Sequence, residues 1–166
     1  LDSTGAYTFY NNNSVNVETY GNLYNWYAVD DERGICPEEW YVPTDEEFKT
    51  LEMYLGMSQE EADLIETEFN RGKDEGSKLA GNADLWDCCA LESNSEFGTS
   101  GFNGLPAGYH HMNNEGFLHM HAYASLWTSS VESGEPWCRE LNADHTDIGR
   151  SLYSPQYGYS VRCIEN

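Results

Sequence analysis

Two histidines, His119 and His121, have the spacing that comes nearest to a metal site. They fall in a strand-like run over residues 117–123, and residues two apart on a strand share a face, so both imidazoles could reach one ion. The spacing fixes no third ligand. We therefore expect an exposed strand with both histidines outward and Met120 inward, and the sequence leaves any metal unknown.

Asp144, His145 and Asp147 bring two carboxyl groups and an imidazole together, which resembles a catalytic cluster. A solvated loop explains the same residues more simply. The sequence contains no Ser-His-Asp order, no phosphate-binding glycine loop and no paired-carboxylate motif. We expect a binding domain and not an enzyme.

The chain contains five cysteines and no Cys-x-x-Cys pair, so zinc-ribbon and thioredoxin-like sites lack support. An odd number leaves at least one thiol free or paired between chains. We expect an extracellular or envelope origin with a bridge between Cys36 and Cys163. The alternative is an intracellular protein with five buried thiols. The pairing of Cys88, Cys89 and Cys138 is not fixed.

Two helices with capping boxes precede these residues. Thr44 and Ser58 are each followed three residues later by a glutamate, which predicts helices over 44–55 and 58–69. In the second helix, Ala62, Ile65 and Phe69 are expected to face inward. A short strand over 6–10 and a short helix over 20–29 are expected before them.

Helical spacing disappears after Gly72, and strand-like runs follow at 117–123, 126–129, 137–141 and 158–164. Helices first and strands later predict an α+β fold, with helices packed on an antiparallel sheet. We find no repeat and no linker, so one domain over 1–166 is expected.

Charge excludes some partners. The chain has 29 acidic residues against eight Lys and Arg, a net charge of −21. Nucleic acid needs a basic face, and anionic phospholipid surfaces do too, so neither is an expected partner. No apolar run of about 18 residues is present, so no direct membrane insertion is expected.

Several sequence blocks resemble a known family. They are YGNLYNWYA at 20–28, CPEEWYVPTD at 36–45, GF at 101–102, LPAGY at 105–109, WTSS at 127–130 and GYSVRC at 158–163. In this order they resemble the Fibrobacter succinogenes major paralogous domain family, over nearly the whole chain from about residue 7. Glu39 and Tyr41 stand where that family usually has Gly and His, and these departures do not threaten the fold.

The resemblance implies a C-type-lectin-like fold, similar also to formylglycine-generating enzymes, with two main helices on a small antiparallel sheet and long loops. Members are commonly secreted or surface-anchored in bacteria, which implies an extracellular or cell-surface location, a phage or virus particle included. The implied partner is a protein or glycan ligand on a cell surface.

The resemblance extends to variable proteins of diversity-generating retroelements, whose C-terminal region is randomised at adenines. Residues 142–155 contain only amino acids that a randomised AAC codon can encode. We therefore expect a variable binding surface at about 138–157; the alternative is an adhesin or polysaccharide-binding domain with a fixed ligand. The expected contacts are Cys138, Asn142, Asp144, His145, Asp147, Arg150, Leu152, Tyr153 and Tyr157, while Trp127 and Trp137 are expected in the core.

The enzyme relatives need two nearby cysteines close to the C-terminus, which hold copper and activate oxygen. Here only Cys163 lies in that region, Gly158 stands five residues earlier, and Cys138 is outside the spacing. Oxidase activity is therefore not expected. No cofactor is certain. Lectin-type folds often hold calcium, so the glycine- and asparagine-rich loops leave room for a structural calcium.

Overall fold

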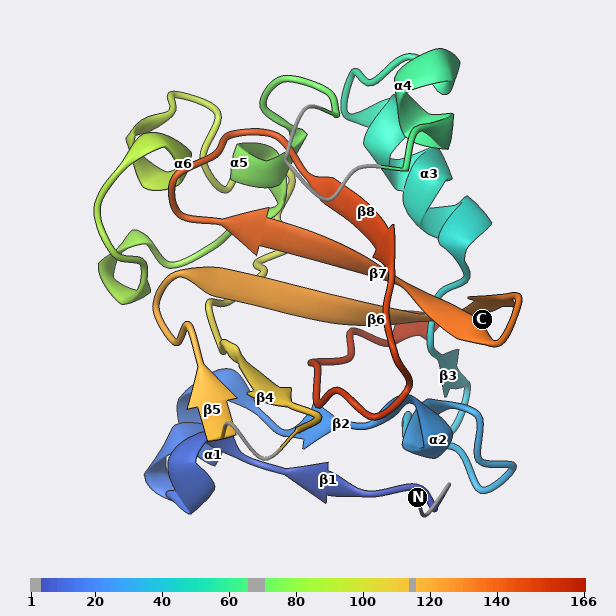
Figure 1. The fold of residues 1–166 in the computed structure, drawn as a ribbon. Coiled ribbons are helices and arrows are strands. Elements are labelled where there is room, and N and C mark those ends of the chain that lie inside the picture. Colours follow the sequence, from blue (N-terminus) through green and yellow to red (C-terminus); the bar gives the residue numbers. More distant parts are fainter. Residues whose placement is uncertain (1–3, 66–70, 114–115) are drawn as a thin grey trace.

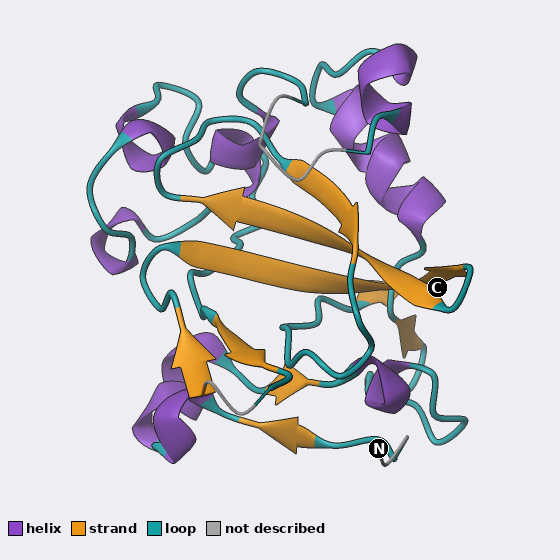
Figure 2. Ribbon diagram, viewed as in Figure 1, coloured by secondary structure: helices purple, strands orange, loops and turns teal. Residues whose placement is uncertain are grey.

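The computed structural model describes residues 4–65, 71–113 and 116–166, which form short helices and strands (Figures 1 and 2). The strands are β1 (Tyr7–Thr8), β2 (Leu23–Tyr24), β3 (Trp40–Tyr41), β4 (Tyr109–His111), β5 (Gly116–Leu118), β6 (Tyr123–Glu132), β7 (Glu135–Asn142), β8 (Gly149–Leu152) and β9 (Ile164–Glu165). The helices are α1 (Val15–Tyr20), α2 (Trp26–Val29), α3 (Asp45–Tyr54), α4 (Gln59–Asp63), α5 (Glu75–Leu79) and α6 (Ala90–Ser93), with 3-10 turns η1 (Tyr10–Asn12) and η2 (Ala83–Leu85). This mixture is compatible with the expected α+β class.

Strands β6, β7 and β8 form the central antiparallel sheet, with β7 in the middle. In Figure 1 the sheet crosses the middle of the molecule, with α3 to α6 on one side and α1, α2, β1, β2, β4 and β5 on the other. Residues 136–142 of β7 are all buried, because both faces of the strand are covered. Successive side chains of a strand point to opposite faces, so β7 serves two different layers.

A buried apolar cluster lies on the side of α3 to α6. It contains Leu141 of β7 together with Leu79 of α5 and Leu91 of α6. The opposite side of the sheet carries an aromatic cluster of Trp26, Trp127, Cys138 and Tyr159. Trp127 and Trp137 are 0% and 4% exposed, which confirms their expected place in the core.

Helices α3 and α4 begin where the capping boxes predict. The hydroxyls of Thr44 and Ser58 accept hydrogen bonds from the backbone N–H groups of Glu47 and Glu61, and each glutamate accepts in return from the backbone N–H of the capping residue. This reciprocal pairing satisfies N–H groups that have no partner inside a helix. Both predicted helix starts are confirmed.

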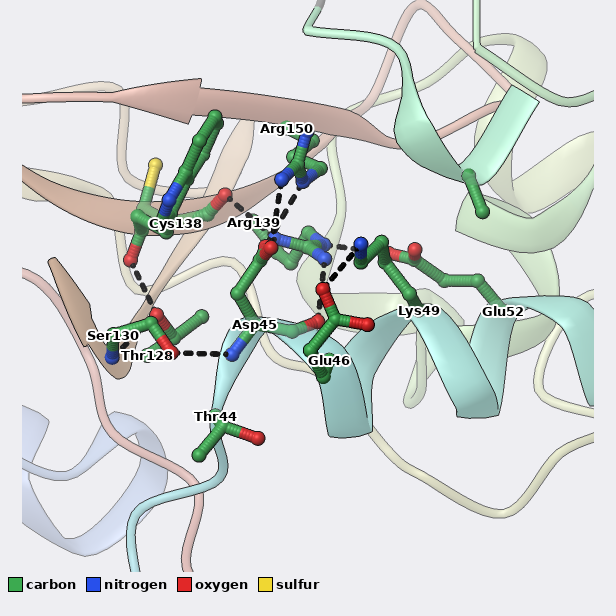
Figure 3. A network of polar contacts seen from close by, with 12 residues as sticks. Thr44, Asp45, Glu46, Lys49, Glu52, Thr128, Ser130, Cys138, Arg139 and Arg150 are labelled. Atoms are coloured by element: carbon green, nitrogen blue, oxygen red, sulfur yellow. Dashed lines mark hydrogen bonds and ion pairs between the residues drawn. The ribbon is translucent and has the colours of Figure 1, made fainter. Parts of the chain in front are cut away.

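Buried charges fix α3 to the central sheet (Figure 3). The Asp45 carboxylate accepts hydrogen bonds from Arg139 at 2.7 Å and from Arg150 at 2.9 and 2.7 Å. Glu52 lies on the same face of α3 as Asp45. It accepts a hydrogen bond from Arg139 at 2.6 Å and also pairs with Arg71. Removing one member of such a network leaves an uncompensated buried charge, so the network specifies where α3 sits on β7 and β8.

The Cys36–Cys163 disulfide is present, as expected, and spans 127 residues of sequence. It lies next to the pairing of β3 with β9, in which Tyr41 is opposite Ile164. Cys88 and Cys89 are exposed and free, and Cys138 is buried and free. The alternative of five buried thiols is therefore wrong.

Three element predictions are corrected. The expected helix over 20–29 is limited to α2, because Gly21 ends α1 with a positive φ, β2 occupies Leu23–Tyr24, and Asn25 caps α2. The expected helix 58–69 ends as α4 at Asp63, and Ile65 is 56% exposed instead of inward. Phe69 lies outside the described residues. Helical structure also continues after Gly72, as α5 and α6.

The strand expectations are partly confirmed. The runs at 126–129 and 137–141 lie in β6 and β7. Of the last run, 158–164, only Ile164 belongs to a strand, β9, and the first strand is limited to β1. The run over 117–123 stops at Leu118, and His119 and His121 adopt left-handed φ values of 60° and 69° in the turn before β6. Over the described residues, no helix is both long and apolar enough to cross a membrane.

Candidate ligand-binding site

A cavity of about 170 Å³ lies on the aromatic side of the central sheet. Its wall consists of five tyrosines: Tyr109, Tyr123, Tyr153, Tyr157 and Tyr159. His111 and Glu140 complete the lining. Tyr159 and Glu140 are buried, whereas the remaining lining residues are half-buried. We call this cavity the tyrosine pocket. Its composition, aromatic rings around a few polar groups, is typical of ligand sites.

Three parts of the chain build the tyrosine pocket. Strand β4 supplies Tyr109 and His111, and the central sheet supplies Tyr123 and Glu140. The segment after β8 supplies the other tyrosines. Hydrogen bonds of 2.9 Å in each direction between Gly158 and His110 hold that segment beside β4.

Glycine is required at position 158 because the two chains approach closely. A Cβ there would lie 2.9 Å from the Cβ of His110, which is closer than real side chains come. Gly158 therefore lets Tyr157 and Tyr159 reach the pocket. Gly158 opens the GYSVRC block on which the family resemblance rests, and its contact with His110 gives a physical reason for glycine there.

The rings in the pocket support one another. Tyr157 lies with its ring centroid 5.5 Å from Tyr159, 5.7 Å from Tyr153 and 6.0 Å from Tyr109. Its hydroxyl and Nε2 of His111 are 3.0 Å apart and share a hydrogen bond. Tilted and edge-on ring pairs at these separations are favourable, so the pocket wall is preformed.

Glu140 lies at the inner end of the pocket and is 6% exposed. Its carboxylate accepts hydrogen bonds from Ser125 at 3.2 Å and from the Tyr153 hydroxyl at 3.0 Å. Burial raises the pKa of Glu140, and the two hydrogen bonds offset only part of that effect. Glu140 therefore retains a proton to higher pH than an ordinary glutamate.

The raised pKa values of two phenol groups indicate a negative potential in the pocket. Burial raises the pKa of Tyr123, and the nearby charges of Glu140 and Asp144 raise it further. Burial also raises the pKa of Tyr153, and Glu140 adds to the effect through its charge and its hydrogen bond. Both phenols therefore stay protonated. Tyr153 donates a hydrogen bond to Glu140, and the Tyr123 hydroxyl accepts one from Asn142.

The expected contact residues divide into four groups. Tyr153 and Tyr157 line the tyrosine pocket. Asp144 is exposed, while His145, with its Nδ1 3.9 Å from Asp147, is partly exposed on the loop that follows β7. Leu152 is half-buried at the end of β8, opposite Trp137. Neither Asp144 nor His145 lines the tyrosine pocket.

The remaining expected contacts are buried, which corrects the expectation that a ligand at the surface touches them. Cys138 is 0% exposed among aromatic rings, and its complete burial raises the pKa of its thiol. Arg150 is 6% exposed because it pairs with Asp45. Asn142 donates to the Tyr123 hydroxyl at 2.8 Å, and Asp147 accepts from the backbone N–H of Arg71 at 3.2 Å.

Sequence reasoning missed Tyr109, His111, Tyr123, Glu140 and Tyr159 as pocket residues. The LPAGY block had identified Tyr109 as a family position but assigned it no role. The alternation of β7 was the available signal for Glu140, because residues two apart share a face and Cys138 was already a candidate.

The expected exposed strand at His119 and His121 is corrected: both residues lie in a turn, so strand spacing does not bring their imidazoles to one face. The ring of His119 lies 4.9 Å from Tyr123, whereas Nδ1 of His121 is 2.9 Å from the carbonyl oxygen of Leu85. Within 4–65, 71–113 and 116–166, no three His, Cys, Asp or Glu side chains gather as a metal site would need.

A larger cavity of about 410 Å³ lies near the start of the chain, between β1 and the loop after α2. Small residues such as Gly5, Ala28 and Gly34 form much of its lining, and its charged groups, Asp31 and Arg33, pair with each other at 2.6 Å. It offers fewer convergent polar groups than the tyrosine pocket, which is therefore the better candidate.

Comparison with known proteins gives one match. The family model described as Fibrobacter succinogenes major domain matches residues 1–165. No curated protein and no solved structure matches the chain.

Proposed function

This chain belongs to the Fibrobacter succinogenes major domain family, and from that premise we propose that it is a non-enzymatic ligand-binding domain whose site is the tyrosine pocket. The observation that carries the proposal is the convergence of five tyrosines from three parts of the chain on buried Glu140. Tyrosine gives a large contact area and a hydroxyl at low entropic cost. A preformed aromatic pocket also needs little ordering when a ligand binds.

A fixed ligand suits the geometry better than a randomised surface. Variable display requires exposed side chains that can change without unfolding the core. Seven of the fourteen residues in 142–155 are buried, namely Asn142, Ala143, Asp147, Ile148, Gly149, Arg150 and Ser151. The proposal therefore favours the adhesin or polysaccharide-binding alternative over retroelement diversification. If diversification occurs, it is confined to 144–146 and 152–157.

The finer fold and the location are parts of the same proposal. A C-type-lectin-like arrangement is supported by α3 packed on a small antiparallel sheet with long loops. A location outside the reducing cytoplasm is supported by the Cys36–Cys163 disulfide. The proposed partner is a protein or glycan on a cell surface.

Oxidase chemistry of the formylglycine-generating kind is not part of the proposal. Such chemistry needs two neighbouring thiols, but Cys163 is bonded to Cys36 and Gly158 has no side chain. Cys138 lies closed in by Trp127 and Tyr159.

Arrays of immobilised glycans and peptides test this function. The wild-type chain is expected to retain a defined subset of ligands, and Tyr157→Ala is expected to lose them because it removes one pocket wall. Tyr54→Ala is the matched control, since Tyr54 is 86% exposed on α3 and outside the pocket. Equal retention by wild type and a folded Tyr157→Ala would place the site elsewhere. Chemical conversion of a retained ligand would contradict the non-enzymatic role.

A further inference from the structure

The tyrosine pocket holds a carboxylate, Glu140, for which the described residues provide no positive partner. The donors to Glu140 are the neutral hydroxyls of Ser125 and Tyr153. Across the described part of the chain, no Lys, Arg or His forms an ion pair with it. Buried carboxylates in proteins normally have a charged partner or a metal. The Asp45 carboxylate, on the other side of β7, has two arginines.

The alternation of β7 explains this difference. Arg139 points toward α3, where Asp45 and Glu52 neutralise it. Glu140, the next residue, points into the tyrosine pocket on the opposite face. The strand therefore separates the positive side chain from the negative one, so that Arg139 is not available to pair with Glu140.

The tyrosine rings around Glu140 attract positive charge, as the Glu140 carboxylate does. The faces of tyrosine rings are negative and attract cations, and cages of aromatic rings bind quaternary ammonium groups. Tyr109, Tyr153, Tyr157 and Tyr159 lie within 5.5–6.0 Å of one another in adjacent pairs. The chain also carries a net charge of −21, which draws cations toward the surface and repels anions.

The size of the pocket limits what can enter. Its volume of about 170 Å³ is below the range of typical cavities for drug-sized ligands, which is roughly 300–1,000 Å³. A head group of a few heavy atoms fits such a cavity, whereas the remainder of a larger ligand would stay at the half-buried rim.

We propose that the tyrosine pocket binds a small organic cation: an ammonium head group whose charge is balanced by Glu140 and whose methyl groups contact the tyrosine rings. The inference rests on the proposed function, in which this pocket is the binding site, and adds the chemical class of the ligand. Binding involves no covalent step. The cation supplies the positive partner that Glu140 lacks among the described residues.

A charge series of equal shape tests the proposal in the wild-type chain. The probes are choline, its neutral carbon analogue 3,3-dimethyl-1-butanol, and the anion 3,3-dimethylbutanoate. Titration is followed by NMR of the tyrosine rings at about pH 8, where an ordinary histidine is neutral. Choline is expected to bind at least about tenfold more tightly than the neutral analogue, and the anion weakest. This comparison needs no variant and therefore does not depend on how a substitution folds.

The variant Glu140→Gln tests whether the Glu140 carboxylate is the group that attracts the cation. It is expected to weaken choline binding by about tenfold or more, with little effect on the neutral analogue. Glu135→Gln is the matched control, because Glu135 is exposed at the start of the same strand. Equal affinity for choline and its neutral analogue, or no binding of choline, overturns the cation inference. Tyr157→Ala separates the two proposals: if it abolishes retention on the arrays while choline fails to bind wild type, the pocket stands and its cation preference falls.

Discussion

Asp45 connects α3 with two strands of the central sheet, through Arg139 and Arg150. Replacing it by asparagine removes the negative charge between two buried guanidinium groups. We expect Asp45→Asn to lower the free energy of unfolding by about 3–5 kcal/mol, the cost of breaking a buried pair. Urea unfolding measures this loss. Exposed Asp84→Asn is the control, expected within about 0.5 kcal/mol of wild type.

The contribution of Asp45 to stability should depend on pH in a definite direction. Burial alone would raise the pKa of Asp45, but the hydrogen bonds and charges of Arg150 and Arg139 outweigh burial and lower it. A lowered folded-state pKa means that Asp45 stabilises the fold above the pKa of the unfolded carboxyl, and that this stability is lost as pH falls. Asp45→Asn should therefore flatten the acid limb of a stability–pH curve. An unchanged acid limb would contradict the assignment.

Individual residues show what sequence reasoning could reach. Tyr153 and Tyr157 were predicted in the site, because tyrosines in a polar loop are recognisable without knowing their neighbours. Arg150 was expected at the binding surface but is buried, which the sequence could not show, since its partner Asp45 is 105 residues away and no local pattern connects them. Glu140 was missed for a similar reason: its importance comes from surrounding rings that belong to other segments.

Helix α5 depends on a close contact at Gly76. A Cβ on this residue would lie 2.0 Å from the carbonyl oxygen of Asp147, a backbone atom that cannot move freely. Alanine normally favours a helix over glycine by about 1 kcal/mol, but here we expect Gly76→Ala to destabilise by about 1–3 kcal/mol through overpacking. Thermal unfolding beside Thr50→Ala, an exposed α3 control, checks this. A Gly76→Ala chain as stable as wild type would show that the loop at Asp147 can yield.

Elements with their own local signals were predicted well. The capping boxes gave the starts of α3 and α4 from side chains within three residues of each other. Helices α5 and α6 have only five and four residues, too few to show periodicity and too short to persist without tertiary contacts. The segment 158–163 reads as a strand but makes isolated bridges, because its pairing positions are divided between β4, β6 and β2.

The Cys36–Cys163 disulfide links the loop before β3 to the residue that precedes the last strand, β9. Replacing both cysteines by serine removes a cross-link across 127 residues. The entropic model predicts a loss of roughly 4–5 kcal/mol, measurable by urea unfolding. The double variant Cys88→Ser/Cys89→Ser is the matched control, because those thiols are exposed and free, and it should unfold like wild type. Similar losses in both double variants would mean that the bridge contributes no special stability.

At the scale of the molecule, the α+β class and the family followed from the order of elements and from blocks spread along the chain. The pocket did not, because it exists only where β4, the central sheet and the last segment meet. Sequence motifs predict individual helices, turns and family membership. A cavity depends instead on the distances between elements that are far apart in the sequence.

The opposite charges on the two faces of β7 help to specify its pairing register. A slip of one residue would turn Arg139 toward the tyrosine rings and Glu140 toward Asp45 and Glu52. The sheet would then place three carboxylates together on one side and an unmatched guanidinium on the other. The clustered carboxylates and the unmatched guanidinium would each cost free energy. The charges on the two faces of β7 therefore disfavour a shifted strand register.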